Sequence, residues 1–363
     1  MLSLNNKISI RQMQILLVLD IFGTGVIVLP RKVAGITGND GWLSVLTATA
    51  AVLVCVFFIT QLAGKFKEKS FVDYSCEILS KPLGIIVGLL FMVRIFCHAV
   101  VELRLFGEIV RQTMLHNTPF WILCAVMLVI SAYTAAKGYE TRARIAELLI
   151  AIIFIPLLLV FLMGINSVDF SNLLPLLKSD ARSYAAGGYE AMFSFTGAEL
   201  LLLAFPYLNR PEKAGRGAAG AVLAVGLFMT AITALTIARF GAGIVQQQMW
   251  PVLEMADTVD VPGAFVERMG VVVMSFWIIS VFAIVNAGLF FSSLILRDVV
   301  KKGTHTVYII IAAVIIFAVT MLLGSMDTAD EFARVINNIL GIAFMFFIPF
   351  FMLIIAKVRG LGR

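Results

Sequence analysis

Apolar stretches of helix length recur along the whole chain, separated by short segments that contain charged residues, proline or glycine. They lie at about residues 10–36, 42–64, 82–110, 119–136, 143–164, 184–208, 217–240, 264–296, 306–324 and 332–356. With some tilt and flanking residues, each is long enough to cross the roughly 30 Å apolar core of a bilayer. The pattern therefore predicts an all-α membrane protein with about ten transmembrane helices.

Composition agrees with this pattern. Hydrophobic residues make up 61% of the 363 residues, charged residues make up 14%, and the mean hydropathy is +1.00. These values exclude a soluble globular domain of this size. Because no soluble domain or long linker interrupts the pattern, we expect residues 1–363 to form a single transmembrane domain.

Two of the apolar stretches are interrupted. Gly23-Thr24-Gly25 precedes Pro30, and Ser194-Phe195-Thr196-Gly197-Ala198 precedes Pro206 about 170 residues later. A broken membrane helix frees backbone N–H and C=O groups, which are tolerated only where they line a protected cavity. Alternatively, the glycines only allow helices to pack closely.

The positions of the breaks favour a binding site. Five predicted spans precede the connection near residue 170 and five follow it, so the breaks fall in the first and sixth spans. An odd number of spans per half gives the halves opposite orientations. This predicts a 5+5 inverted repeat, with one repeat at about 8–164, the other at about 184–358, and a site near the midplane.

The breaks offer complementary backbone groups to a ligand. Glycines beside Thr24 let the backbone leave helical geometry and approach a ligand closely. Freed carbonyl groups would face an ammonium group, and the N–H groups that open the second half-helix would face a carboxylate.

Acidic residues lie beside both breaks. Asp20 is one turn before Thr24, and Glu199 directly follows the second break. A carboxylate within a membrane span is costly and faces water, a partner or a function. Asp20 could meet a substrate amine, exchange a proton or cap freed backbone, and Glu199 could be a paired structural acid.

The third span carries a polar stripe. At 100° per residue its polar positions lie on one face, which must point away from lipid. Arg104 and Glu108 can neutralise each other one turn apart, whereas His98 is either a proton relay or a hydrogen-bonded structural residue. The stripe comprises Arg94, His98, Glu102, Arg104 and Glu108, with Val101 and Leu105 at its centre.

The distribution of basic residues predicts the orientation. With both termini in the cytoplasm, most of the 28 basic residues fall on the cytoplasmic side, as the positive-inside rule requires. The net charge of +6 then indicates contact with anionic membrane lipid rather than nucleic acid. The inner set includes Lys65, Lys67, Lys69, Lys137, Arg142, Arg144, Arg210, Lys213, Arg216, Arg297, Lys301 and Lys302.

Residue patterns typical of catalysis or of a cofactor are missing from the sequence. It contains no Ser/His/Asp grouping, phosphate-binding glycine loop or metal-ligand cluster. The cysteines lack metal-ligand spacing and are expected to pack as apolar residues. We expect neither an enzyme nor a bound cofactor or metal. The four cysteines are Cys55, Cys76, Cys97 and Cys124.

Several motifs together resemble the B subunit family of endospore germinant receptors, within the amino acid, polyamine and organocation transporter superfamily. The resemblance covers nearly the whole chain. The motifs are Ile8-Ser9 with Gln12, Gly23-Thr24-Gly25 running to Leu29-Pro30, Asp40-Gly41-Trp42-Leu43-Ser44, Lys81-Pro82-Leu83-Gly84 and Phe193-Ser194-Phe195-Thr196-Gly197-Ala198-Glu199.

The resemblance implies a LeuT-like fold and a subunit of the spore inner membrane. Such a subunit senses a small germinant, often an amino acid, together with A and C partner subunits. Asp20, His98, Glu102 and Glu199 remain possible coupling or structural charges. By analogy with the superfamily, spans 1, 3, 6 and 8 surround the ligand. The implied ligand-binding residues are Gly23, Thr24, Gly25, Val101, Leu105, Phe195, Thr196, Gly197 and Asn286.

One departure from transporter relatives concerns the fifth span. Its middle, at about Ile150 to Val160, has no lysine to replace a coupling cation. This favours a sensor over an active symporter. An amino acid transporter that works by alternating access is the alternative, and a passive water or ion pore is a third class.

Overall fold

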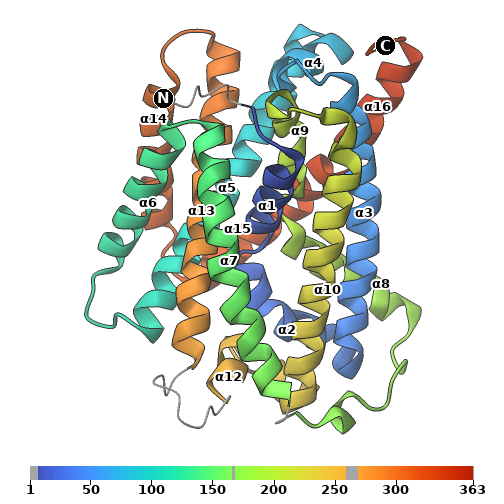
Figure 1. Ribbon diagram of the computed structural model, residues 1–363, viewed down its shortest axis with the longest axis vertical. Helices are drawn as coiled ribbons and strands as arrows, with labels where there is room; N and C mark the ends of the chain where they lie inside the picture. The colour runs from blue at the N-terminus through green and yellow to red at the C-terminus, as the bar shows by residue number, and fades with distance from the viewer. Residues whose placement is uncertain (1–6, 166–167, 259–268, 363) are drawn as a thin grey trace.

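The computed structural model describes residues 7–165, 168–258 and 269–362, which are almost entirely helical (Figure 1). Within this part of the chain, the β-structure consists of an isolated bridge between Ile8 and Leu208. The predicted all-α class is confirmed. The longer helices are α1 (Ile10–Ile21), α2 (Thr24–Thr37), α3 (Gly41–Lys65), α4 (Phe71–Ile78), α5 (Lys81–Thr113), α6 (Phe120–Ala136), α7 (Tyr139–Gly164), α8 (Ala181–Met192), α10 (Ala214–Phe240), α12 (Pro251–Asp257), α13 (Met269–Val300), α14 (His305–Leu322), α15 (Met326–Ile336) and α16 (Ile348–Val358).

Short elements connect these helices. Most are 3₁₀ turns, but η8 and η9 are π-helical and join α15 to α16 without a break. The short elements are η1 (Gly38–Asp40), η3 (Phe170–Leu173), η4 (Phe193–Phe195), η5 (Ala198–Leu200), α9 (Leu201–Ala204), η6 (Phe205–Tyr207), η7 (Pro211–Lys213), α11 (Ala242–Val245), η8 (Asn337–Gly341) and η9 (Ala343–Phe347).

Seven helical segments of the described chain are long and apolar enough to cross a membrane. Leu148 on α7 and Val314 on α14 are 71% and 64% exposed, as expected for side chains that face lipid. The chain is therefore a multi-pass membrane protein; the count of about ten spans remains a prediction, and residues 264–268 of the predicted eighth span lie outside the described residues. The seven segments are Thr24–Lys65, Lys81–Thr113, Tyr139–Gly164, Pro211–Phe240, Met269–Val300, His305–Leu322 and Met326–Val358.

Helix α1 begins at a capping box. The Ser9 hydroxyl accepts from Gln12 N at 3.2 Å, and the Gln12 side chain accepts from Ser9 N at 2.9 Å. This reciprocal pair satisfies two backbone donors that the helix start leaves free. Ile8 N also donates to Tyr207 O at 2.7 Å. The start of the first interrupted segment therefore lies against the end of the second.

Both termini lie at the same end of the helical bundle, together with α4, while α12 and the turn between α2 and α3 lie at the other end (Figure 1). Arg359 Nη1 donates to Ile78 O at 2.6 Å, which joins the end of α16 to α4. Gly84 lets α4 pack directly on α5, since a Cβ at Gly84 would lie 2.3 Å from Cys76 N. This close approach explains the glycine of the Lys81-Pro82-Leu83-Gly84 motif.

At the opposite end, Asp40 joins the α2–α3 turn to the segment before α8. Its carboxylate accepts from the backbone N–H groups of Leu177, Lys178 and Ser179 at 2.9, 2.9 and 3.2 Å, and from the Tyr184 hydroxyl at 2.8 Å. Burial favours the neutral acid, but these hydrogen bonds outweigh it and lower the pKa of Asp40. The Asp40 contacts therefore hold α8 beside α2.

Candidate functional site

The first break lies between α1 and α2. Gly23 is extended, with φ −102° and ψ −157°, and frees the amide that opens α2. Thr24 N and Thr24 Oγ1 both donate to Glu102 Oε2, at 3.2 and 2.7 Å. A Cβ at Gly23 would lie 2.6 Å from Ile284 Cδ1 and 2.9 Å from Glu102 Oε1, so a larger residue here would require these side chains to shift. A protein carboxylate thus occupies the helix N-terminus at which the sequence analysis expects the ligand's carboxylate.

The second break separates η4 from η5. Gly197 adopts φ +112°, which favours glycine, and its N–H donates to Glu199 Oε2 at 3.0 Å. Arg94 Nη2 lies 3.3 Å from Glu199 Oε1 and 3.1 Å from Thr196 Oγ1. The freed backbone is therefore held by an acid that is itself paired with a buried guanidinium.

The two breaks are in direct contact. A Cβ at Gly25 would lie 3.2 Å from the Cα, Cβ and Oγ atoms of Ser194. A Cβ at Gly197 would lie 2.4 Å from the carbonyl oxygen of Asp20. Residues about 170 positions apart thus form one junction, and the small size of the glycines is what permits it.

Helix α5 supplies one polar face to this junction. Arg94, His98 and Glu102 follow one another at intervals of four residues and therefore lie on successive turns of one face. Arg94 and Glu102 are only 2% and 5% exposed, so the predicted inward direction of the stripe is confirmed. His98 Nε2 is buried and has no hydrogen-bond partner among the described residues.

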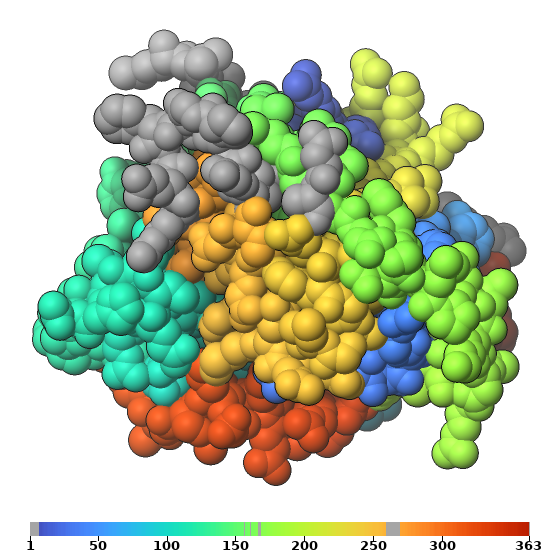
Figure 2. All heavy atoms as spheres, turned by 90° about the horizontal axis from the view of Figure 1, so that it is seen from below, coloured from blue at the N-terminus to red at the C-terminus, as the bar shows by residue number. Residues whose placement is uncertain are grey.

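A cavity of about 80 Å³ lies where this face meets the breaks. A larger cavity of about 490 Å³ shares part of its lining, including Thr24, Leu105 and Asn337, and reaches Trp250 and Met326. These residues belong to the segments of α12 and α15, and Figure 2 shows the α12 segment (gold) beside α15 (red-orange) at the end opposite the termini. The two cavities therefore adjoin, with the smaller one at the breaks and the larger one toward that end of the bundle.

Comparison with known proteins places the chain in a family. Residues 7–330 match the family model described as spore germination protein. The chain belongs to the spore germination protein family. It is 27% identical over 303 residues to spore germination protein YndE of Bacillus subtilis (strain 168), covering 83% of this chain and 84% of that protein. It is 25% identical to GerLB of Bacillus cereus, covering 93% and 91%, and 25% identical to spore germination protein KB of B. subtilis (strain 168), covering 96% and 94%.

In this spore germination family member, most predicted ligand-binding residues surround one cavity. The 80 Å³ cavity is lined by Gly23, Thr24, Gly25, Val101, Leu105 and Thr196, and also by His98 and Glu102.

The other predicted site residues lie elsewhere. Phe195 is fully buried. Gly197 lines a separate cavity of about 10 Å³, together with Asp20 and Glu199. Asn286 turns toward α6, where its Nδ2 donates to Ser131 O at 2.9 Å and to Thr134 Oγ1 at 2.6 Å. The Asn286 side chain therefore joins α13 to α6.

The ligand-site prediction omitted other lining residues. Lys32 and Glu190 form an ion pair of 3.0 Å at the wall that both cavities share. Arg94 was visible in the polar stripe, four residues before His98. Nothing in the sequence pattern pointed to Asn337 as a lining residue, because it lies in a π-helical turn that apolar periodicity does not reveal.

One prediction of charge location was wrong. Arg142 was predicted to be a cytoplasmic loop residue, but it lies in the first turns of α7, is 4% exposed and forms an ion pair with Asp20. Arg142 Nη2 also lies 3.4 Å from Ala283 O on α13. Because charged residues surround Arg142 in the sequence, spacing alone does not tell which of them turns inward. This ion pair was not among the roles predicted for Asp20, which were contact with a substrate amine, proton exchange and capping of freed backbone.

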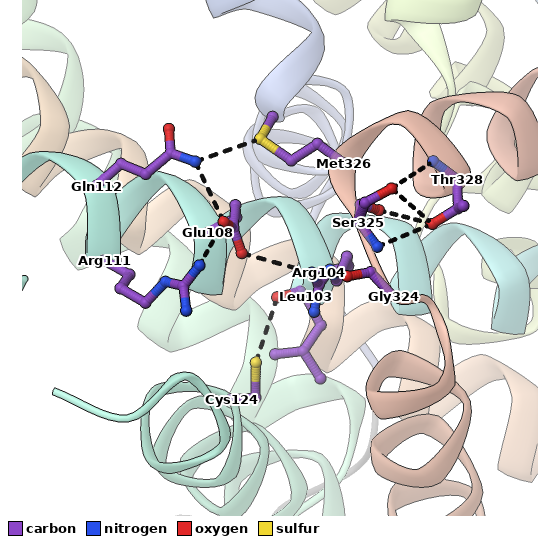
Figure 3. Close-up of polar contacts among 10 residues, drawn as sticks. All are labelled: Leu103, Arg104, Glu108, Arg111, Gln112, Cys124, Gly324, Ser325, Met326 and Thr328. Atoms are coloured by element: carbon purple, nitrogen blue, oxygen red, sulfur yellow. Dashed lines mark hydrogen bonds and ion pairs between the residues drawn. The ribbon is translucent and has the colours of Figure 1, made fainter.

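A second charge cluster fixes the C-terminal part of α5 (Figure 3). Arg104 Nη2 lies 3.5 Å from Glu108 Oε2, so the predicted neutralisation is confirmed. Arg104 also donates to Gly324 O at 3.2 Å, and Gln112 Nε2 lies 3.8 Å from Met326 Sδ. The cluster therefore ties α5 to the start of α15, which borders the larger cavity.

Within the described residues, no group of three or more His, Cys, Asp or Glu side chains is arranged to hold a metal ion. The four cysteines are free thiols, and Cys55, Cys97 and Cys124 are buried. The cavity thus offers carboxylates, a guanidinium, an imidazole and backbone groups as its polar chemistry. These groups bind small polar molecules by hydrogen bonds and charge.

Proposed function

We propose that this chain is the nutrient-sensing membrane subunit of a germinant receptor. It binds a small germinant, such as an amino acid, in the cavity at the two breaks and signals to A and C partner subunits. The observation that carries the proposal is the meeting of both breaks at one cavity in a member of the spore germination family. The proposed ligand contacts are Gly23, Thr24, Gly25, Val101, Leu105 and Thr196.

The proposed architecture is LeuT-like, with about ten spans in a 5+5 inverted repeat. It is supported by the contact between the breaks and by the helical residues that the structure gives to each predicted span. We propose that the termini face the cytoplasm from the spore inner membrane. Their position at one end and the positive-inside bias support this orientation, and the larger cavity then lies toward the outer side.

The alternative function is amino acid transport by alternating access, and the large cavity that adjoins the breaks favours it. Arg142 argues against an ion-coupled transporter, because its permanent positive charge lies between α1 and α13 and neutralises Asp20. No bound cation is needed there for charge balance. We therefore favour a sensor in which the ligand shifts the balance between two conformations by binding one of them more tightly.

Purified full-length protein in liposomes separates these functions. We expect a pool of the common amino acids to contain members that raise the thermal unfolding midpoint without uptake of the same radiolabelled compound. Saturable uptake would establish a transporter and reject the sensor, whereas solute-independent flux of water or ions would indicate a pore. No stabilisation by any amino acid, sugar or nucleoside would reject ligand binding altogether.

A further inference from the structure

Apart from His98, the basic side chains of the described residues that line the 80 Å³ cavity are already paired with acids. Arg94 is paired with Glu199 at 3.3 Å, and Lys32 with Glu190 at 3.0 Å. The Nε atom of Arg94 has no partner but is buried near Gly341, where an added Cβ would lie 3.6 Å away. A ligand carboxylate would therefore find no unpaired lysine or arginine at this cavity.

Glu102, in contrast to these basic residues, has no oppositely charged partner among the described residues. Its Oε2 accepts from Thr24 N and Thr24 Oγ1, and no basic side chain of the described residues forms an ion pair with it. Its Oε1 has no hydrogen-bond donor within the described chain and lies against Gly23, 2.9 Å from where a Cβ would stand. Since Glu102 lines the cavity, one acceptor atom of a buried carboxylate is available to a ligand.

We infer that Glu102 binds the ammonium group of the ligand, so that the site takes primary amines and holds an amino acid with its ammonium group at the first break. This inference rests on the proposed function and specifies its ligand. The amino acid orientation is the reverse of the one expected from the sequence, because Glu102 already fills the N-terminus of α2. His98, one turn along α5, presents its unpartnered Nε2 as a further polar contact.

The physical reason is charge balance in a desolvated site. An ammonium group at Oε1 neutralises a carboxylate that the protein leaves without a cation, and it forms a charge-assisted hydrogen bond. A ligand with only a carboxylate would place a second negative charge beside Glu102, which disfavours binding. The absence of a side chain at position 23 lets this carboxylate lie directly against the first break.

Three matched series of compounds test the inference on the full-length protein. For each amino acid, the free form, the amide, which keeps only the amine, and the N-acetyl derivative, which keeps only the carboxylate, are titrated by thermal shift. We expect the free form and the amide to bind within about tenfold of each other, and the N-acetyl form at least about 30-fold more weakly. Tight binding of the N-acetyl forms with none of the amides overturns the inference while leaving the proposed function intact. No binding in any series rejects both.

A charge variant gives an independent test. Glu102→Gln keeps an oxygen for the Thr24 donors and removes the charge, so amide binding is expected to fall about 30-fold or more. Glu68→Gln removes an exposed acid that forms no ion pair within the described part of the chain, and it serves as the matched control with unchanged binding. Undiminished amide binding by Glu102→Gln overturns the inference. If this variant does not fold, the compound series on the unmodified protein decides.

Discussion

The two breaks satisfy their freed backbone groups in different ways. At the second break, Glu199 accepts the Gly197 N–H and pairs with Arg94, so acid and cation balance within the protein. At the first break, Glu102 accepts both Thr24 donors and has no basic partner among the described residues. At the second break, the charges balance each other and stabilise the fold. An unpaired carboxylate beside a cavity leaves electrostatic free energy available for a ligand.

The largest expected effect comes from forcing the breaks apart. Gly25→Leu places a Cβ 3.2 Å from the backbone of Ser194, and Thr196→Leu removes the hydroxyl that Arg94 contacts. We expect both variants to reach the membrane and to lose ligand-dependent thermal stabilisation completely. Gly35→Leu, on the same helix with nothing within 4 Å of its Cβ position, is the control. A normal response in both site variants would remove the case for the junction.

Replacing the cation of the second break should destabilise the protein itself. Arg94→Met leaves the buried carboxylate of Glu199 without its cationic partner, which we expect to lower the free energy of unfolding by about 3–5 kcal/mol. Adding Glu199→Gln should recover part of this loss. Thermal unfolding in detergent measures both changes.

Arg144→Met is the matched control for Arg94→Met. Arg144 is 44% exposed in its pair with Glu140, and such pairs contribute about 0–1 kcal/mol. Equal losses of unfolding free energy in the two arginine variants would contradict the interpretation that the charges at the second break stabilise the fold.

Sequence reasoning predicted the parts of this molecule that depend on composition and backbone chemistry. Apolar periodicity located the helices, and Gly23, Gly25 and Gly197 marked the breaks because glycine permits both close approach and positive φ. The inward stripe of α5 followed from the cost of charge in lipid. The family resemblance is confirmed by the match over residues 7–330.

Side-chain partnerships across the fold were not predictable in the same way. Arg142 and Asp20 are separated by more than 100 residues, and several basic residues near Arg142 compete for the role. Glu102 was recognised as a charge in the stripe, but its contact with Thr24 depends on how α5 and α2 pack. Asn286 was expected at the ligand site, and its turn toward α6 depends on how α13 packs.

A smaller effect tests the first break alone. Thr24→Val removes one of the two donors to Glu102 while the backbone N–H remains. We expect ligand affinity to fall about five- to tenfold, the effect of one hydrogen bond of about 1 kcal/mol. Thr24→Ser retains the hydroxyl and should bind as the unmodified protein does. An unchanged affinity in Thr24→Val would show that the hydroxyl does not position Glu102.

The smallest effect on binding is expected at Asp40, which lies far from both breaks. Because its hydrogen bonds lower its pKa below the ordinary value of 3.8, its stabilisation is present above that pH and is lost as the pH falls further. Asp40→Asn should lower stability by about 1–2 kcal/mol near pH 7 without changing ligand affinity.

The measurement for Asp40 is the difference in unfolding midpoint between unmodified protein and Asp40→Asn. This difference should narrow below about pH 4. A difference that widens in acid would mean that Asp40 is stabilised in its neutral form.

Helix α5 is 33 residues long, which corresponds to about 50 Å at 1.5 Å per residue. It carries Arg94 and Glu102 at its centre, is tied to the start of α15 through Arg104, and meets α4 at Gly84 without an intervening side chain. One continuous helix therefore connects the cavity at the breaks to the end of the molecule where both termini lie. A tilt of α5 imposed at Glu102 would act as a lever on α4, delivering a mechanical displacement across the membrane with no moving ion.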